Sequence, residues 1–535
     1  MLDIRIQKRE WVFVVIMAIV LCAIAFIPQI VAFRHAPADA QYMMTLYPVP
    51  DDTNSYFTWI RQATDGHFFF NFKYSSEAHI RALFHPIFLS MGLLVKAGIP
   101  LVGVWYGTQV LSILLLVWTL YVFISRFFIR VALRRFGLAF ISLAGGWGFL
   151  HFVLHRNAVT LWTPADISMT ETTLARSISW PFIFCFSVVL ILWSFLMYMR
   201  YLESPQRKYF YGAAAAGFAV SLIHPYDAGI IASVAGLYTI IRYGFGRIPT
   251  VIAYVCIVIL PTLYHAVLLI DPVFRGHSTF DMSSPNPVAY LGGFGILVPL
   301  AVIGAVVILL GSRFQKKSDW LLPIVWAGVL PLLLYAPVNF QRRMIEGGIV
   351  AYGILAVLGM QTIWQILRSF HPTHRVLYRW TVWGGMSAVV LISMLTVVSL
   401  FSDDLKRAQH PSYPYVIPKT IGESMTWLDK QASPDDVILS AWATGSFIPR
   451  LTGSVTYIGH GAQTYKAGRK SAEAEKFFSF FTPMSERDRL VIDRGITYVV
   501  YGPYELRNQT IDFSSSKILQ QVYDNGEVKI FKRIK

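Results

Sequence analysis

The feature that most constrains this chain is a series of about eleven apolar segments, most of them near 20 residues long. A helix needs roughly 20 mostly apolar residues to cross a bilayer. The composition agrees, because 55% of the residues are hydrophobic and only 14% are charged, against about 25% charged in soluble domains. The sequence therefore predicts a polytopic α-helical membrane protein. The predicted spans lie near residues 11–33, 102–125, 137–155, 180–200, 211–224, 228–242, 249–270, 287–312, 320–337, 347–367 and 380–401.

Basic residues cluster in alternate connections between these spans, near residues 126–135, 200–208, 242–247, 313–317 and 368–379. Short loops rich in Lys and Arg stay on the cytoplasmic side. Arg5, Lys8 and Arg9 are also basic. They precede an apolar run longer than the roughly 7–15 apolar residues of a signal peptide, which favours a retained anchor. We therefore expect a plasma (inner) membrane protein with a cytoplasmic N-terminus and an extracytoplasmic C-terminus.

The net charge of +16 lies mostly in the predicted membrane region. Residues 1–401 hold 28 of the 46 Lys and Arg residues but only 15 of the 30 acidic residues. Positive charge in this location is a topology signal, and no basic helix or zinc motif accompanies it, so no nucleic-acid partner is expected. The three cysteines all fall in apolar runs and do not indicate a disulfide framework.

The first external loop, at about 34–101, is unusually rich in groups that can do chemistry. Asp51 and Asp52 are adjacent, and Glu77, His79 and His85 follow. A carboxylate suits a hard divalent cation, or it can act as a general base towards a hydroxyl. The alternative is a solvated loop with a capped helix. If the acidic pair is catalytic, we slightly favour Asp52 as the base. On an extended segment the two side chains would point to opposite faces, so only one of them would face the cavity.

Later external connections add further ionisable residues. Asp166 and Glu171 lie in the second loop, and His224 and Asp227 lie in the turn HPYD between two short spans. Ionisable groups near membrane depth are costly unless they face a cavity. Arg342 and Arg343, in NFQRR, sit on the side that lacks basic clusters. A guanidinium holds phosphate through two donors, so this pair indicates either a bound phosphate group or an anchor to lipid phosphates.

From about residue 402 to 535 the pattern changes to that of a small soluble α/β domain. Strands are predicted at 436–440, 497–502 and 528–534, and helices at 420–431, 467–480 and 485–494. A loop-rich stretch containing Arg450 and His460 is a candidate surface for binding donor or acceptor. Residues 1–401 are accordingly assigned to a transmembrane catalytic domain and 402–535 to an extracytoplasmic α/β domain.

The order of features along the chain resembles that of the GT-C superfamily of membrane glycosyltransferases. These features are the first span, the acidic loop PDDTNSY, the acids of the second loop, the NFQRR loop and the C-terminal domain. This group includes protein mannosyltransferases, aminoarabinose transferases and oligosaccharyltransferase subunits. The resemblance implies a catalytic or metal-binding role for Asp51 or Asp52 and a donor-phosphate role for Arg342 or Arg343. If a divalent cation such as Mg²⁺ or Mn²⁺ is used, it implies Asp52, Asp166 and Glu171 as ligands.

The expected activity is transfer of a sugar from a polyprenyl-phosphate donor to a glycan, lipid or protein acceptor on the extracytoplasmic face. Glu77, His79, His85, Asp166, Glu171, His224 and Asp227 are then candidates to line the cavity. No WWD motif occurs in the C-terminal region, where TWLDKQ is nearest, which argues against N-linked oligosaccharide transfer. A transporter or flippase of lipid-linked sugars would also carry membrane charges. A non-catalytic scaffold leaves the acidic pair and NFQRR unexplained.

Overall fold

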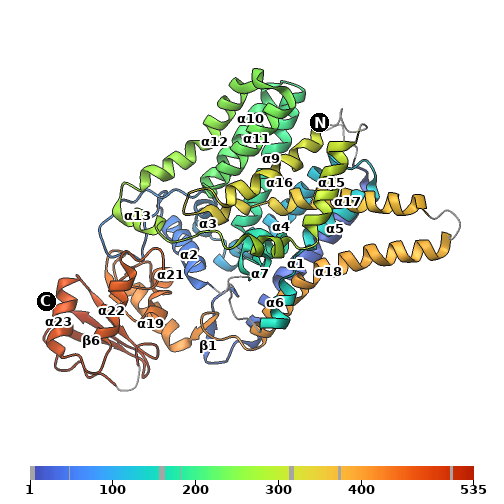
Figure 1. The fold of residues 1–535 in the computed structure, drawn as a ribbon. Helices are drawn as coiled ribbons and strands as arrows, with labels where there is room; N and C mark the ends of the chain where they lie inside the picture. Colours follow the sequence, from blue (N-terminus) through green and yellow to red (C-terminus); the bar gives the residue numbers. More distant parts are fainter. Residues whose placement is uncertain are drawn as a thin grey trace. The chain divides into compact units, whose positions relative to one another are not determined.

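The computed structural model describes residues 6–46, 49–155, 163–180, 182–311, 318–370, 375–506 and 510–534. The basic residues expected at 313–317 lie outside these ranges. Contacts group the chain into two compact units, each built from three stretches of sequence (Figure 1). We call Met1–Pro28, Tyr106–Tyr264 and Asp281–Asp404 the helical unit. We call Gln29–Trp105, His265–Phe280 and Leu405–Lys535 the mixed unit.

All eleven predicted spans fall on helices. Within the described residues, seven helical stretches are long and apolar enough to cross a membrane, or eight if α14 and α15, which meet at 82°, form one broken span. The main helices are α1 (Lys8–His35), α4 (Leu101–Ser125), α5 (Val131–Leu143), α6 (Gly148–His155), α9 (Ile183–Glu203), α10 (Arg207–Ile223), α11 (Asp227–Tyr243), α12 (Ile248–Leu268), α14 (Pro287–Phe294), α15 (Leu297–Leu310), α16 (Leu321–Leu334), α17 (Gly348–Phe370) and α18 (Arg375–Gln409). The remaining predicted spans correspond to α10, α11 and α16, which have 17, 17 and 14 residues.

Small residues let the helices of the helical unit approach closely. A side chain at Gly304 of α15 would lie 2.1 Å from the Leu355 carbonyl of α17, and one at Gly359 would lie 2.1 Å from the Leu300 carbonyl. The small side chains Ala213, Ala214 and Ala216 of α10 are likewise buried. Membrane helices associate through such small residues, because lipid removes the hydrophobic driving force between helices.

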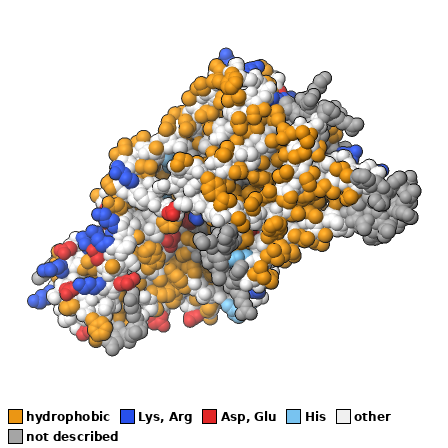
Figure 2. Space-filling view, in the orientation of Figure 1, with side chains coloured by type: hydrophobic (Ala, Val, Ile, Leu, Met, Phe, Trp, Pro, Cys, Tyr) orange, Lys and Arg blue, Asp and Glu red, His pale blue; other side chains and the backbone are white. Residues whose placement is uncertain are grey.

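Large apolar side chains also remain exposed on several helices, among them Ile252, Leu260 and Leu263 of α12 and Val302 and Leu309 of α15. Figure 2 shows hydrophobic side chains over much of the visible face of the helices. An apolar surface this extensive is unfavourable in water and favourable against lipid. The chain is thus an integral membrane protein, as its sequence predicts.

The mixed unit contains a five-stranded sheet in the order β4-β3-β5-β7-β6. Strands β3 (Val437–Leu439), β4 (Val455–Thr456) and β5 (Tyr498–Tyr501) are parallel, whereas β7 (Lys529–Arg533) runs antiparallel to β5 and to β6 (Leu519–Asp524). Helices α19 (Lys419–Gln431), α22 (Ala467–Phe477) and α23 (Met484–Asp493) accompany them. All six elements predicted for this region are present; β4 and β6 were not predicted.

The same unit includes the loop that the sequence predicts to be the first external one, and this loop is largely structured. It forms α2 (Pro50–Thr64) and α3 (Pro86–Lys96), and these pack so closely that a side chain at Gly92 would lie 2.2 Å from the Ala63 β-carbon. Strand β1 (Ala40–Tyr42) pairs antiparallel with β2 (Val416–Pro418). The early loop and the C-terminal region therefore share one folded unit.

Candidate active site

The predicted site residues divide between the two units. Asp51, Asp52, Glu77, His79 and His85 belong to the mixed unit, and the other six belong to the helical unit. Each group is described within its own unit.

Asp51 and Asp52 lie in the first turn of α2. Pro50 occupies the first helical positions, where its missing N–H has no cost, and acidic residues near a helix N-terminus interact favourably with the helix dipole. The prediction of an extended segment is therefore wrong at this point. Neighbouring residues on a helix are separated by about 100° rather than 180°, so the two carboxylates can serve one side of the helix.

Asp51 is held by the chain segment that follows β4. Its Oδ2 accepts a hydrogen bond from the Gly461 amide at 2.8 Å, and Nδ1 of His460 lies 4.0 Å from the same oxygen. Burial raises the pKa of Asp51 to about 6, and the Asp52 charge also raises it, while the Gly461 bond acts in the opposite direction. A carboxylate that takes up its proton near neutral pH is well matched to general-base chemistry.

Helix α2 is fixed along its length by residues nearly 400 positions away. Asn54 donates to Ser446 Oγ at 2.9 Å, and the Gln463 amide donates to Ser55 Oγ at 2.9 Å. Arg450 donates to Asn54 Oδ1 at 3.1 Å and to the Met43 carbonyl at 3.0 Å. Its guanidinium also lies 3.7 Å from the centre of the Phe57 ring. The flagged stretch around Arg450 and His460 thus positions the helix that carries Asp51.

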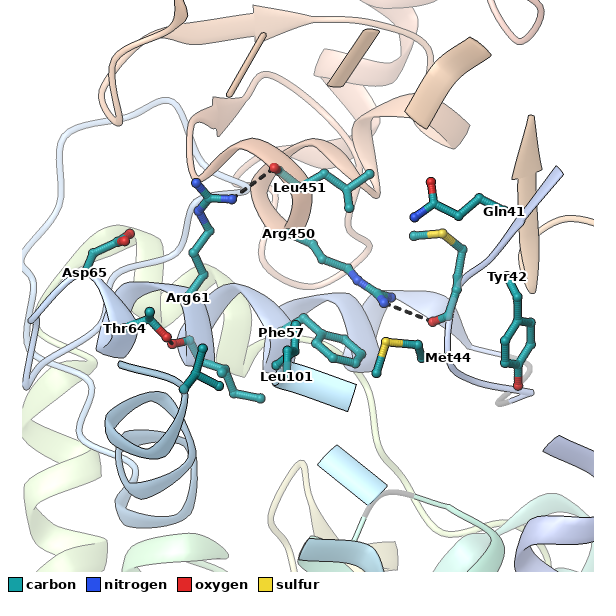
Figure 3. A pocket seen from close by; sticks show the side chains of 13 residues that line it. Gln41, Tyr42, Met44, Phe57, Arg61, Thr64, Asp65, Leu101, Arg450 and Leu451 are labelled. Atoms are coloured by element: carbon teal, nitrogen blue, oxygen red, sulfur yellow. Dashed lines mark hydrogen bonds between the residues drawn. The ribbon is translucent and has the colours of Figure 1, made fainter. Parts of the chain in front are cut away.

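Arg450 also lines a pocket of about 360 Å³ beside the later turns of α2. Figure 3 shows Arg450 extending towards Phe57 and Met44, whereas Arg61 points to the Leu451 carbonyl, to which it donates a hydrogen bond. The volume is within the range of small-molecule sites, and the lining is mainly apolar. Local sequence patterns do not reveal this pocket, because its walls come from β1, α2, α3, α4 and α21 (Ile448–Thr452).

The other candidates of the first loop contact neighbouring parts of the mixed unit. Glu77 accepts a 2.8 Å bond from Lys470, which is itself fully buried. His79 accepts from the Phe72 amide at 3.0 Å and bonds to the Glu77 carbonyl at 2.7 Å. His85 precedes α3, as its position before Pro86 suggests, and its ring lies 4.3 Å from that of Phe88.

In the helical unit, the two arginines of NFQRR have different environments. Arg343 forms an ion pair with Glu171, whose side chain is only 5% exposed, and lies 5.9 Å from the Phe184 ring centre. Arg342 is partly exposed. Within the described part of the chain, its side chain makes no hydrogen bond or ion pair. Arg342 is therefore the better placed of the two to accept an external phosphate.

Asp166 is fully buried in the connection before α8 (Leu174–Ser179). Its Oδ2 accepts from the amides of Gly146 at 2.8 Å and Gly148 at 3.2 Å. Burial raises the pKa of Asp166 to about 7, partly offset by these bonds and by Thr396. These bonds tie the second loop to the break between α5 and α6.

His224 and Asp227 lie at the turn between α10 and α11. The His224 Nδ1 is 3.1 Å from Ser187 Oγ and 3.6 Å from Asp227, and both residues are buried. Glu346 is buried as well and interacts electrostatically with Asp227, Glu171 and Arg343. Glu346 is not among the residues predicted from the sequence, because nothing in its local sequence shows that it is buried.

Neither unit supplies a complete set of metal ligands from its described residues. No group of three or more His, Cys, Asp or Glu side chains gathers closely enough to hold an ion. Of the three implied ligands, Asp166 is engaged by two backbone amides and Glu171 by Arg343.

No family model matches the sequence, and no curated protein matches it. Solved structures do. The chain is similar to the oligosaccharyltransferase AglB of Archaeoglobus fulgidus in complex with an inhibitory peptide and a dolichol-phosphate, with 11% identity over 92% of this chain and 69% of that one, and a TM-score of 0.51. An AglB structure with Zn and sulfate gives 12% identity, 92% and 68% coverage, and a TM-score of 0.52.

The chain is also similar to ArnT of Cupriavidus metallidurans bound to undecaprenyl phosphate, with 11% identity, 98% coverage of both chains and a TM-score of 0.51. Fold and site together describe a polytopic helical membrane protein with a C-terminal α/β region and a half-buried acid at the start of a short polar helix. More particularly, its fold is like that of AglB and ArnT. Both are membrane glycosyltransferases of the superfamily that the sequence resembles, so the resemblance is confirmed for the fold.

Proposed function

We propose that this protein is a glycosyltransferase that moves a sugar from a polyprenyl-phosphate donor to an acceptor hydroxyl on the extracytoplasmic face of the membrane. The observation that carries the proposal is Asp51, a carboxylate with a pKa near 6 on the first turn of α2 in a GT-C fold. The named ligands of the similar structures, undecaprenyl phosphate in ArnT and dolichol-phosphate in AglB, support a lipid-phosphate donor.

In the proposed reaction, Asp51 removes the proton of the acceptor hydroxyl as its oxygen bonds to the anomeric carbon of the sugar. The bond from that carbon to the phosphate oxygen breaks, and the lipid phosphate leaves with the electron pair. Arg342 binds the phosphate and stabilises the charge that develops on it. Asp51 replaces Asp52 as our choice of base, because the Gly461 amide orients the Asp51 carboxylate.

The direct test is to incubate the purified protein with a panel of polyprenyl-phosphate sugars and candidate acceptors, and to measure released lipid phosphate together with glycosylated acceptor. Parallel reactions with Mg²⁺, with Mn²⁺ and with a chelator test the divalent cation that the resemblance implies. Stoichiometric release and transfer are expected. Movement of intact donor between leaflets, with no release, would instead indicate a flippase.

The catalytic prediction is that Asp51→Asn lowers turnover by about 10²–10⁴-fold, the usual contribution of a general base, while donor binding survives. Because the base must be ionised, kcat/KM of the unmodified protein should fall as the pH drops through about 6. Asp52→Asn is the matched control and should retain far more activity. Near-normal turnover in Asp51→Asn would remove this residue from the mechanism.

Asp51→Asn is expected to raise the stability of the folded protein although it lowers turnover. The folded-state pKa of Asp51 lies above its ordinary value of 3.8, so its ionisation opposes folding. That penalty grows between pH 3.8 and about 6 and is constant above it. Asp51→Asn should therefore raise the thermal stability at pH 8, by at most about 2–3 kcal/mol, and change it little at pH 4. Melting curves at the two pH values measure this difference.

A further inference from the structure

His460 is almost fully buried in the segment between β4 and α22, with only 3% of its surface exposed. Its Nδ1 accepts two backbone hydrogen bonds, from the amides of Ala462 and Gln463, both at 3.0 Å. An imidazole nitrogen that accepts hydrogen bonds carries no proton, so the proton of the neutral ring lies on Nε2. Burial lowers the pKa of His460 well below its ordinary value, and nearby His277 lowers it further, so the ring stays neutral.

These two hydrogen bonds form a tight turn of the chain at Gly461. The amides of residues 462 and 463 turn inwards to the imidazole, while the Gly461 amide between His460 and these residues points to Asp51 Oδ2 at 2.8 Å. Thr464 closes the same turn, since its hydroxyl accepts from the His460 amide at 3.2 Å. His277, which is half-buried, hydrogen-bonds to the Ala462 backbone from the side of α13 (Pro272–Ser278). The segment is thus held from several sides.

We propose that His460 is a positioning residue for the transfer reaction: by gathering the Ala462 and Gln463 amides, it fixes the Gly461 N–H so that it orients and stabilises the Asp51 carboxylate. The inference rests on the proposed role of Asp51 as the base. His460 itself exchanges no proton in the reaction. It acts on Asp51 only through the backbone, because its Nδ1 is 4.0 Å from the carboxylate and is already occupied.

The charged and titratable groups that act on Asp51 are few. Asp52 on the same helix raises the pKa of Asp51, His460 faces it uncharged, and Tyr413 and Tyr74 interact with it electrostatically. Losing the Gly461 bond would leave burial and Asp52 unopposed and would raise the pKa of Asp51 further. A hydrogen bond to a charged group typically changes a pKa by about one unit or more.

The test compares the pH dependence of kcat/KM in matched variants. His460→Leu removes the acceptor of the two amides, whereas His460→Asn offers a side-chain oxygen near the position of Nδ1. We expect the acidic limb to move up by about one pH unit in His460→Leu and by much less in His460→Asn, with KM for the donor unchanged. Thr452→Val, at another buried hydroxyl of this region, controls for general destabilisation and should leave the limb in place.

A second pair of variants changes the Gly461 amide itself. Its result does not depend on how well the His460 variants fold. A methyl group at Gly461 would lie 3.5 Å from Asp51 Oδ2 and 3.9 Å from Phe280, which are ordinary contacts. Gly461→Ala therefore keeps the N–H and should leave the acidic limb at the pH of the unmodified protein. Gly461→Pro removes the N–H and should reproduce the shift of His460→Leu.

Two outcomes overturn the inference, and they differ from failure of the proposed function. If Asp51→Asn abolishes turnover but neither His460→Leu nor Gly461→Pro moves the acidic limb, Asp51 is the base and His460 only supports the fold. The same conclusion follows if His460→Asn shifts the limb as far as His460→Leu. If Asp51→Asn is fully active, the proposed base is wrong and the positioning role falls with it.

Discussion

At the scale of single residues, charge environment separates side chains that look equivalent in the sequence. Asp51 and Asp52 are adjacent acids, yet the Gly461 amide bonds to Asp51. Arg342 and Arg343 are adjacent cations, yet Arg343 is paired with the buried Glu171. In both pairs the deciding partner is distant in sequence. Spacing alone could therefore nominate the pairs but could not choose within them.

The arginine pair gives a prediction with two separable effects. Arg342→Ala should raise KM for the lipid-phosphate donor about 10–100-fold, the value of a charge-assisted hydrogen bond, and leave the folded protein intact. Arg343→Ala should instead destabilise by about 3–5 kcal/mol, because it leaves Glu171 buried and unpaired. Donor titrations and thermal unfolding in detergent measure the two effects.

The control for this prediction is Arg343→Met combined with Glu171→Leu. Replacing both members of a buried ion pair with apolar side chains is often nearly neutral for stability, so the double variant should regain much of the lost stability. If Arg343→Ala affects only KM, or if Arg342→Ala affects only stability, the division of roles is wrong.

At the scale of elements, the sequence predicted helices and strands well where a local pattern encodes them. Apolar length predicted the membrane helices, and short strand-like apolar runs predicted β3, β5 and β7. It missed β4 and β6: β4 has two residues, and β6 is polar at Gln520 and Gln521 on an exposed edge of the sheet. Helix α2 has a mean composition too polar for a span, and its docking depends on residues far along the chain.

The docking of α2 predicts that Arg450→Met loosens this helix. The variant loses hydrogen bonds to Asn54 and Met43 and the contact of the guanidinium with the Phe57 ring. Charge-assisted bonds of this kind contribute about 1.5–3 kcal/mol each. Amide hydrogen exchange over residues 50–64 should accelerate, and turnover should fall because α2 carries Asp51.

Arg469→Met is the matched control, since Arg469 lies on the surface of α22 with its side chain 47% exposed and its partner Glu473 3.5 Å away. Exposed ion pairs contribute about 1 kcal/mol or less, so α2 exchange and turnover should stay unchanged. Equal exchange in the two variants would show that Arg450 does not hold α2.

At the scale of the whole molecule, the folded units do not follow the linear order of the chain. The mixed unit combines Gln29–Trp105, His265–Phe280 and Leu405–Lys535. Composition predicted the membrane helices and a C-terminal α/β fold, but no local signal joins an early loop to strands nearly 400 residues later. Such non-local pairing depends on side-chain complementarity that a single sequence does not display. The order of the motifs nonetheless predicted a fold like that of ArnT and AglB.

Membrane sidedness is the remaining whole-molecule prediction. The exposure of each residue decides which positions can carry a cysteine for labelling. Asn54 and Lys470 are buried and would label poorly, whereas Asp65, Lys476 and Arg207 are exposed. In a background lacking Cys22, Cys185 and Cys256, a membrane-impermeant maleimide should react with Asp65→Cys and Lys476→Cys from outside intact cells. Arg207→Cys should react only after permeabilisation, because basic connections remain cytoplasmic. Labelling of Asp65→Cys and Lys476→Cys from opposite sides, or of Arg207→Cys in sealed cells, would contradict the predicted topology and move the proposed reaction away from the extracytoplasmic face.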